Sequence, residues 1–175
     1  NVFFDIHNAY GDRKLFNNLQ SYIREQTRKN PSFFQHYARN CLLYRPPLNL
    51  FGQIQTKDNL VSLKKCFRPI ELFARLYALK YDVRATNTIE RLNALVEKNV
   101  ITEDSRREII YIFDYIWHLR FKNQVFQYGD LRKVNNKLNL GHLMEIEREN
   151  LKNILHKIRS FQTMLSYDFF GTPNA

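Results

Sequence analysis

The segment 70–81 constrains the fold most, because its side chains are apolar nearly all the way round a helix. A helix at the surface of a protein keeps a polar face, so this helix must be enclosed by others. The rest of the chain supplies them, since apolar residues recur there at intervals of three and four. Breaks at 8–12, 30–32 and 45–47 bound the first two such helices, and later ones are expected over about 87–98, 102–128 and 144–169.

The sequence after the second predicted helix has a different character. Two short runs, 48–55 and 60–65, have an extended pattern and flank the turn-like residues 56–59. This arrangement predicts a β-hairpin, and the helical pattern resumes at Pro69. We therefore expect a mainly α fold in a single domain over 1–175, an antiparallel helical bundle with a small β-hairpin.

The composition is typical of a folded protein, since 14 Phe and 10 Tyr provide side chains for a core. The two cysteines, Cys41 and Cys66, lack the spacing of a metal site or of a disulfide framework. We expect neither a cleavable leader nor a membrane span, because no apolar run approaches the roughly 20 residues that span a bilayer. These features together predict a cytoplasmic protein.

The net charge of +10 favours anionic partners such as nucleotides, nucleic acid or an acidic protein. The basic residues are dispersed along the chain, however, and this pattern is also typical of a generic solvated surface. The motifs of self-contained chemistry are missing: the sequence has no Gly-rich phosphate-binding loop, no His-Glu-x-x-His and no grouping of histidines with cysteines. We therefore predict that the chain alone is not catalytic and binds no cofactor of its own.

Polar residues that break the apolar pattern are the first candidates for a functional site. Arg120 falls in the middle of the predicted buried face of the segment 102–128, with Gln124 at the edge of that face. An unpaired guanidinium in such a place would cost several kcal/mol, so Arg120 needs a partner. Either a carboxylate within the bundle or a bound phosphate satisfies this requirement.

Three further candidates lie nearer the middle of the chain. Arg75 interrupts the apolar segment, and Glu71, four residues earlier, is the partner expected if this arginine only forms a local ion pair. Lys64 stands at the end of the predicted hairpin, where a lysine is either solvated or reaches toward a phosphate. Asn87, with Glu90 three residues later, predicts the capped start of a helix.

Several short strings also form a family pattern through their order and spacing over nearly the whole chain. They are Phe3–His7 with Tyr10–Asp12, Pro47–Gly52, Leu63–Lys64 with Arg68–Ile70, Ala74–Leu79, Asn87–Thr88 with Arg91–Leu92, Leu119–Arg120 with Gln124, and Glu147–Arg148 with Leu151–Lys152. In these strings the chain resembles the nucleotidyltransferases related to the PII-protein uridylyltransferases. Members of that group often carry cyclic-nucleotide-binding and CBS modules upstream.

The resemblance implies a C-terminal substrate-binding domain that positions a nucleotide or an acceptor for an upstream catalytic domain. That domain would contain a Gly-Ser motif and paired aspartates that bind two magnesium ions, so magnesium is implied there and not in this chain. Residues 1–8, with a short strand expected over 2–6, would then be its last strand and Asp5 its third carboxylate. Two departures matter: His7 replaces the Arg of relatives, which weakens the assignment of Asp5, and Ser62 replaces an Asp that could pair with the hairpin lysines.

Three functions are compatible with these observations. In the first, Lys64, Arg75 and Arg120 contact the anionic substrate of a nucleotidyltransferase. Asn87 and Gln124 add hydrogen bonds, and all of these side chains converge on one cleft near the N-terminus. The alternative is a basic helical module that binds RNA or an acidic protein. A third function is purely architectural, a bundle that packs against its own upstream domains or dimerises.

Overall fold

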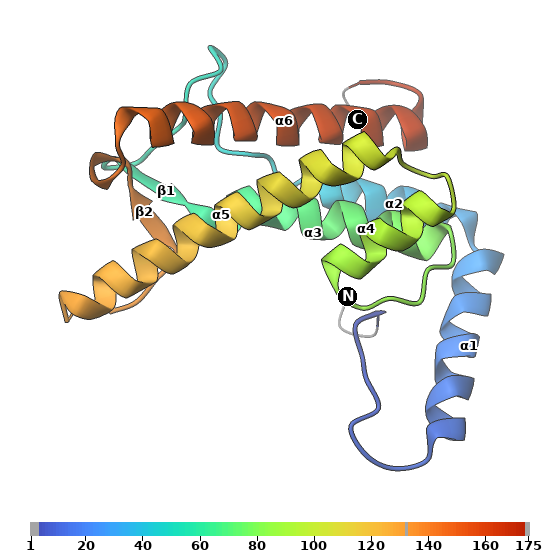
Figure 1. Cartoon of the computed structure of the whole chain (residues 1–175). Helices are drawn as coiled ribbons and strands as arrows, with labels where there is room; N and C mark the ends of the chain where they lie inside the picture. The colour runs from blue at the N-terminus through green and yellow to red at the C-terminus, as the bar shows by residue number, and fades with distance from the viewer. Residues whose placement is uncertain (1–3, 132, 174–175) are drawn as a thin grey trace.

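The computed structural model describes residues 4–131 and 133–173, and it is mainly helical, as predicted (Figure 1). The helices are α1 (Arg13–Lys29), α2 (Pro31–Leu42), α3 (Leu63–Lys80), α4 (Thr88–Glu97), α5 (Glu103–Gly129) and α6 (Glu145–Phe170). The strands are β1 (Leu60–Ser62) and β2 (Lys137–Asn139), and the 3₁₀ helix η2 covers Leu140–His142. No helix in the described part of the chain is long and apolar enough to cross a lipid bilayer.

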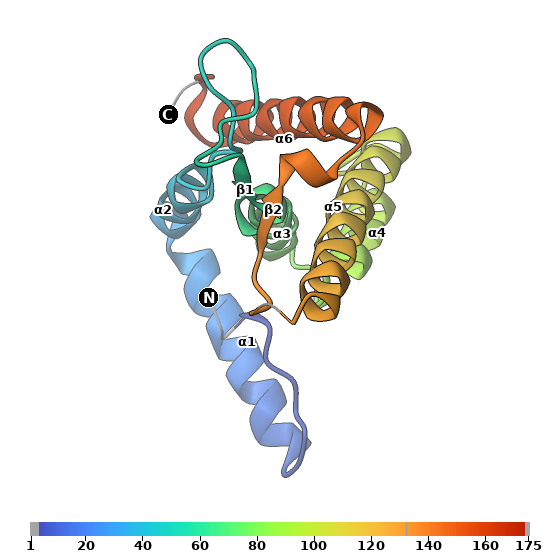
Figure 2. The same cartoon turned by 90° about the vertical axis from the view of Figure 1, so that its left-hand side faces the viewer.

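Helix α3 lies at the centre of the bundle, and α2, α4, α5 and α6 pack against it (Figures 1 and 2). Every residue from Leu72 to Ala78 is buried, which confirms that the middle of the apolar segment is enclosed on all sides, while Lys80 and Tyr81 at its end are exposed. The surrounding helices turn their apolar faces inward; α6, for example, buries Leu151, Leu155 and Ile158. Each fully buried aliphatic side chain contributes about 1.5–3 kcal/mol, so this packing is the main source of stability.

Helix α3 begins at Leu63, six residues before the predicted start at Pro69. Proline inside a helix removes one backbone hydrogen bond and costs about 3 kcal/mol, which is why the sequence pattern suggested a boundary there. Leu63, Cys66 and Phe67 are all buried in the core. Their burial outweighs the cost of the proline, so the helix continues through it.

The predicted β-hairpin is wrong in its pairing. Strand β1 pairs with β2, antiparallel and in the register Leu60↔Asn139, Val61↔Leu138 and Ser62↔Lys137. The run 48–55 contributes only one isolated bridge, from Leu48 to Ile54, within the described residues. The pairing with β2 buries both Val61 and Leu138, which are 1% and 3% exposed, so long-range burial decided which strand became the partner.

Helix α1 forms where the pattern predicts it. The structure describes all of its residues, and none of them is buried. Its apolar residues Leu15 and Tyr22 are 70% and 60% exposed. The helix packs against α2 at one end and projects away from the bundle as an arm (Figures 1 and 2). The strand predicted over 2–6 is not found either: Phe4, Asp5 and Ile6 are not in a strand, and Val2 and Phe3 lie outside the described residues.

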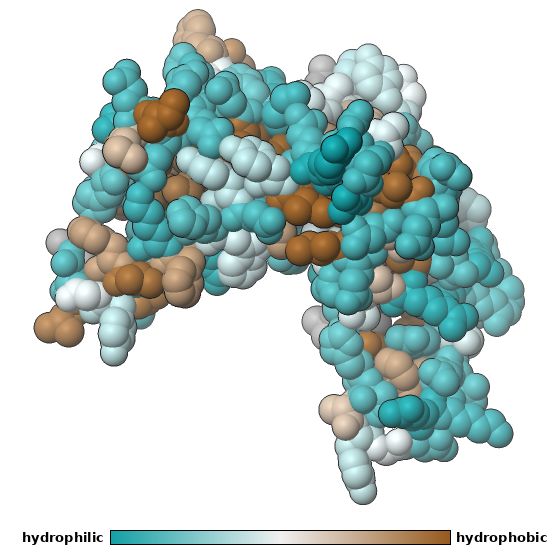
Figure 3. Space-filling view, in the orientation of Figure 1, coloured by the Kyte–Doolittle hydropathy of each residue, from teal (hydrophilic) through white to brown (hydrophobic). Residues whose placement is uncertain are grey.

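The molecule has the outline of an arch. Its two arms are α1 and the C-terminal end of α5, and the surface between them is hollowed (Figure 3). The segment 4–12 descends from below α4 inside this hollow and turns into α1 (Figure 1). The N-terminal segment therefore meets the central helix α3 and helix α4 on the concave side of the arch.

The difference between α3 and α1 gives a test of the fold. Leu76→Ala in α3, where the leucine is fully buried, should lower the free energy of unfolding by about 2–5 kcal/mol. The same substitution at Leu15 of α1 should change it by less than about 0.5 kcal/mol, because that side chain is largely exposed. Urea unfolding of both variants checks this. Equal losses at the two positions would contradict an arm that adds little to the core.

Candidate functional site

A cluster of charges joins the N-terminal segment to the bundle; we call Asp5, Arg75 and Arg91 the Asp5 cluster. Arg75 donates from Nε to Asp5 Oδ1 at 3.3 Å and from Nη2 to Oδ2. Arg91 donates from Nη2 to Oδ1 of the same carboxylate. Both oxygens of Asp5 are therefore held by guanidinium groups, one from α3 and one from α4.

The backbone and the aromatic side chains fix the geometry of this cluster. Arg91 also donates to two carbonyl oxygens, from Nε to Ala85 at 3.0 Å and from Nη2 to Phe4 at 3.3 Å. The ring of Phe4 packs against Phe33 and Tyr37 of α2, with centroids 5.9 and 6.3 Å apart. The segment that carries Asp5 is thus attached to α2 by aromatic contacts and to α3 and α4 by charge.

The arginines of the cluster are deeply buried, with Arg75 9% and Arg91 3% exposed. Burial alone would raise the pKa of Asp5, but Arg91 and Arg75 outweigh it and hold that pKa below its usual value. Burial opposes the charge of Arg75, yet Tyr37 and Asp5 keep the pKa of this guanidinium above its ordinary value. The cluster is therefore fully ionised at neutral pH, and its two cations exceed its one anion by one charge.

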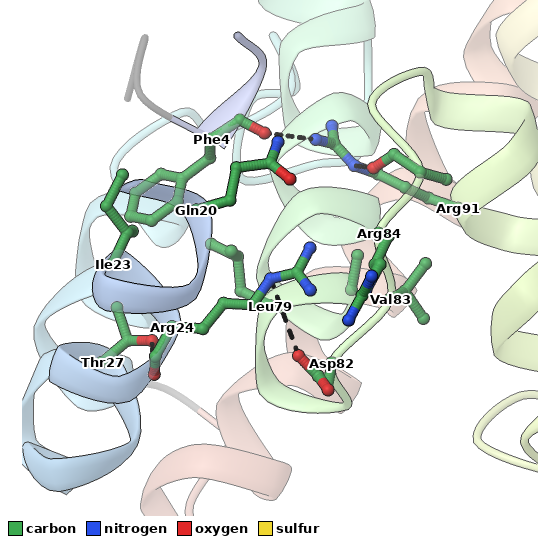
Figure 4. Close-up of a pocket in the computed structure, with 12 residues that line it drawn as sticks. Phe4, Gln20, Ile23, Arg24, Thr27, Leu79, Asp82, Val83, Arg84 and Arg91 are labelled. Atoms are coloured by element: carbon green, nitrogen blue, oxygen red, sulfur yellow. Dashed lines mark hydrogen bonds and ion pairs between the residues drawn. The ribbon is translucent and has the colours of Figure 1, made fainter. Parts of the chain in front are cut away.

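Two concave regions flank the cluster, and Arg91 lines both of them. The first, which we call the α4 hollow, is open to solvent and includes Asp5, Glu71, Arg75, Asn87, Arg91 and Phe113. The second, the α1 pocket, lies between α1 and the loop that joins α3 to α4 (Figure 4). Its polar lining consists of Gln20, Arg24, Thr27, Asp82, Arg84 and Arg91. The cluster stands at the boundary between the two.

Three of the predicted site residues come together in this part of the molecule. Asp5, Arg75 and Asn87 all line the α4 hollow. Asn87 caps α4 as predicted, because its Oδ1 accepts from the backbone N–H of Glu90 at 2.8 Å. The partner expected for Arg75 was wrong: Glu71 pairs with Arg68 at 3.2 Å, and Arg75 pairs with Asp5 instead. A distant aspartate replaced the local glutamate because the N-terminal segment folds back over α3.

The other predicted residues lie apart from both regions. Arg120 is half-buried, with its guanidinium carbon 4.4 Å from the ring centroid of Trp117 and its Nε donating to Asn136 Oδ1 at 2.8 Å. It thus satisfies its charge with aromatic rings and an amide rather than with a carboxylate of the bundle. Lys64 is exposed and Gln124 half-buried, and neither lines the α4 hollow or the α1 pocket.

Arg91 is the functional candidate that the sequence pattern missed. It stands on the same helical face as Leu92 and Leu95, which are fully buried, so it breaks an apolar face as Arg75 does. An arginine on an apolar helical face can be recognised in the sequence, so the same reasoning that chose Arg75 would also have chosen Arg91. Arg24 and Arg84 offered no such signal, because Arg24 lies on the polar side of its helix and Arg84 lies in the loop between α3 and α4.

Magnesium, which the family implies for catalysis, does not fit the residues described here. No group of three histidine, cysteine, aspartate or glutamate side chains within 4–131 and 133–173 could hold a metal ion. Asp5, the carboxylate proposed from the resemblance, faces two guanidinium groups, whose positive charge opposes a cation. A metal-binding function therefore belongs with a catalytic domain and not with this cluster.

The lowered pKa of Asp5 has a consequence for stability. Its carboxylate stabilises the fold fully above about pH 4 and loses this effect as the pH falls through its lowered pKa. Asp5→Asn should therefore lower the free energy of unfolding by about 1–3 kcal/mol at pH 7 and by little near pH 2. Denaturant unfolding over that pH range measures the difference, with Asp114→Asn on the exposed face of α5 as control. A pH-independent difference would show that the charge of Asp5 is not what matters.

Comparisons with known proteins give one match. No curated protein and no solved structure is detectably similar to the chain. A family model matches residues 31–169, which run from the start of α2 to the last turn of α6 and include Arg75 and Arg91. Membership in this family implies a nucleotidyltransferase catalytic domain and its substrate as partners. The match confirms the resemblance seen in the sequence: the chain belongs to the family described as "Putative nucleotidyltransferase substrate binding domain".

Proposed function

We propose that this domain holds an anionic group, of a nucleotide or of its acceptor, in the α4 hollow and presents it to a nucleotidyltransferase catalytic domain. The observation that carries the proposal is the buried pair Arg75 and Arg91, which share one carboxylate. Guanidinium groups bind phosphates and carboxylates through paired N–H donors, and their planar geometry favours such anions over other ligands. The ion pairs of both arginines with the Asp5 carboxylate support this proposal, because they show that the two guanidinium groups can contact one carboxylate together.

The start of α4 adds to the attraction for an anion. Asn87, Thr88 and Ile89 line the hollow, so the N-terminal end of this helix opens onto it. The helix dipole places partial positive charge at that end, next to the two arginines. In the proposal, Arg75 and Arg91 supply the ionic contacts and the residues around Asn87 supply hydrogen bonds.

We keep three other residues as proposed contacts, but only for a larger substrate: Lys64, Arg120 and Gln124. They lie outside the α4 hollow, so they reach a substrate only if it extends from the hollow along α3 and α5. A nucleotide acceptor of protein size has that extent, whereas a single nucleotide does not. Arg120 is the best placed of the three, because its stacking on Trp117 holds the guanidinium at a half-exposed position.

The shape of the molecule supports a catalytic domain on the concave side of the arch. The N-terminal segment lies there, and both arms carry exposed apolar side chains (Figures 1 and 3). These are Leu15, Leu19 and Tyr22 on α1, and Phe121, Val125 and Tyr128 on α5. Apolar surface of this kind is commonly covered by a neighbouring domain. A role for Asp5 as a catalytic carboxylate would require it to leave both arginines first.

A single charge placed in the hollow tests the proposal. Asn87→Asp should keep the cap of α4, because aspartate caps helices as well as asparagine does. The new carboxylate should repel an anion, and we expect the affinity for ATP, UTP or pyrophosphate to fall about tenfold or more, a loss of about 1.4 kcal/mol. Isothermal titration calorimetry with the chain 1–175 at low ionic strength measures the affinity.

The matched control is Asn93→Asp, the same substitution on an exposed position of the same helix. It changes the net charge equally, so it should leave the affinity nearly unchanged if binding is local to the hollow. Equal losses for the two variants would indicate a diffuse basic surface and would favour the alternative, a module for RNA or an acidic protein. In that case binding of mixed RNA should also fall steeply with salt.

A further inference from the structure

The α1 pocket contains more positive charge than its own residues balance. Arg24 of α1 and Arg84 of the loop between α3 and α4 line the pocket together with Asp82. Two arginines of α1 pair with the Asp82 carboxylate: Arg24, and Arg28 just outside the lining. Arg24 Nε lies 3.7 Å from Asp82 Oδ1, and Arg28 Nη2 lies 2.7 Å from Oδ2. Both oxygens of Asp82 are thus engaged. The three guanidinium groups that line the pocket, those of Arg24, Arg84 and Arg91, exceed this one carboxylate by two charges, although Arg91 is also paired with Asp5.

Two side chains of the pocket have unused hydrogen-bonding groups. Within the described residues, the side chains of Arg84 and Gln20 make neither a hydrogen bond nor an ion pair. Figure 4 shows Arg24 and Arg84 extending toward the same space, with Gln20 beside it. Arg91, which is 3% exposed, closes the inner end next to Phe4. The donors of three elements therefore face one small volume.

The electrostatics of this arrangement favour the binding of an anion. Burial lowers the pKa of Arg24, and Arg84 and Arg28 lower it further by repulsion, while Asp82 acts in the opposite direction. The apolar walls, formed by side chains such as Ile23, Leu79 and Val83, strengthen this repulsion because they exclude water. A bound anion would convert the mutual repulsion of the arginines into attraction to a common ligand.

We propose that the α1 pocket is a binding site for a single phosphate group, separate from the α4 hollow. A phosphate ester carries about 1.5–2 negative charges at neutral pH and three acceptor oxygens, which matches the surplus charge and the free donors. The free volume of about 40 Å³ holds a few water molecules, so a phosphate group fits and a nucleotide base does not.

The ligand would also attach the α1 arm to the bundle. Arg24 and Gln20 belong to α1, whereas Arg84 and Arg91 belong to the bundle and its loops. Helix α1 buries none of its residues, all of them described, so few apolar contacts fix its position. Residues 13–29 also lie outside the family match, and the site therefore combines the family domain with an element that the match does not include.

Inorganic phosphate is the probe for the test, titrated into the chain 1–175 by calorimetry. Arg84→Gln removes an exposed guanidinium, and Gln20→Glu adds a carboxylate without changing the shape of the side chain. We expect each to weaken phosphate binding about tenfold. Gln26→Glu, the same substitution on α1 but outside the pocket, and Asn87→Asp in the α4 hollow should leave it unchanged.

Hydrogen exchange provides a second readout, because phosphate should slow the exchange of amides in α1 when it binds between the arm and the bundle. The proposal is overturned if phosphate does not bind at millimolar concentration, or if Arg84→Gln and Gln20→Glu bind it as well as the original chain. If Asn87→Asp weakens phosphate binding instead, the phosphate binds in the α4 hollow. If Gln20→Glu and Gln26→Glu weaken phosphate binding equally, the phosphate is attracted by a diffuse basic surface and not by the α1 pocket.

Discussion

The enclosure of α3 is the constraint on which the rest of the structure depends. A helix that is buried from Leu72 to Ala78 has no solvated face, so other helices must cover every side of it. Helices α2, α4, α5 and α6 do so, and strand β1 leads directly into it. Once α3 is in the centre, any polar side chain on its middle turns has to find its partner inside the protein.

Arg75 is the side chain to which this applies, and its position explains the Asp5 cluster. A guanidinium on a buried turn needs an anion, and the N-terminal segment supplies it through Asp5. Arg91 approaches the same carboxylate from α4, so the ion pairs fix the segment against two helices at once. The packing of the core and the electrostatics of the candidate site are therefore two consequences of one buried helix.

The same geometry separates two regions that could hold anions. Arg91 lies between them, with the α4 hollow on one side and the α1 pocket on the other. In the proposed functions, the hollow takes a substrate group and the pocket takes a phosphate that also positions the α1 arm. Since both arms border the concave side, the orientation of α1 would affect how a catalytic domain sits on this surface (Figure 3).

The sequence by itself determined the helical class, the central place of segment 70–81, the cap at Asn87 and the family, because these follow from local periodicity, capping chemistry and ordered strings. It did not determine which partners meet across the chain. The pairing of β1 with β2, the continuation of α3 through Pro69 and the ion pair of Arg75 with Asp5 were decided only by the tertiary structure. The physical reason is that each depends on burial between segments far apart in the sequence, whereas periodicity reports only which face of a segment is apolar.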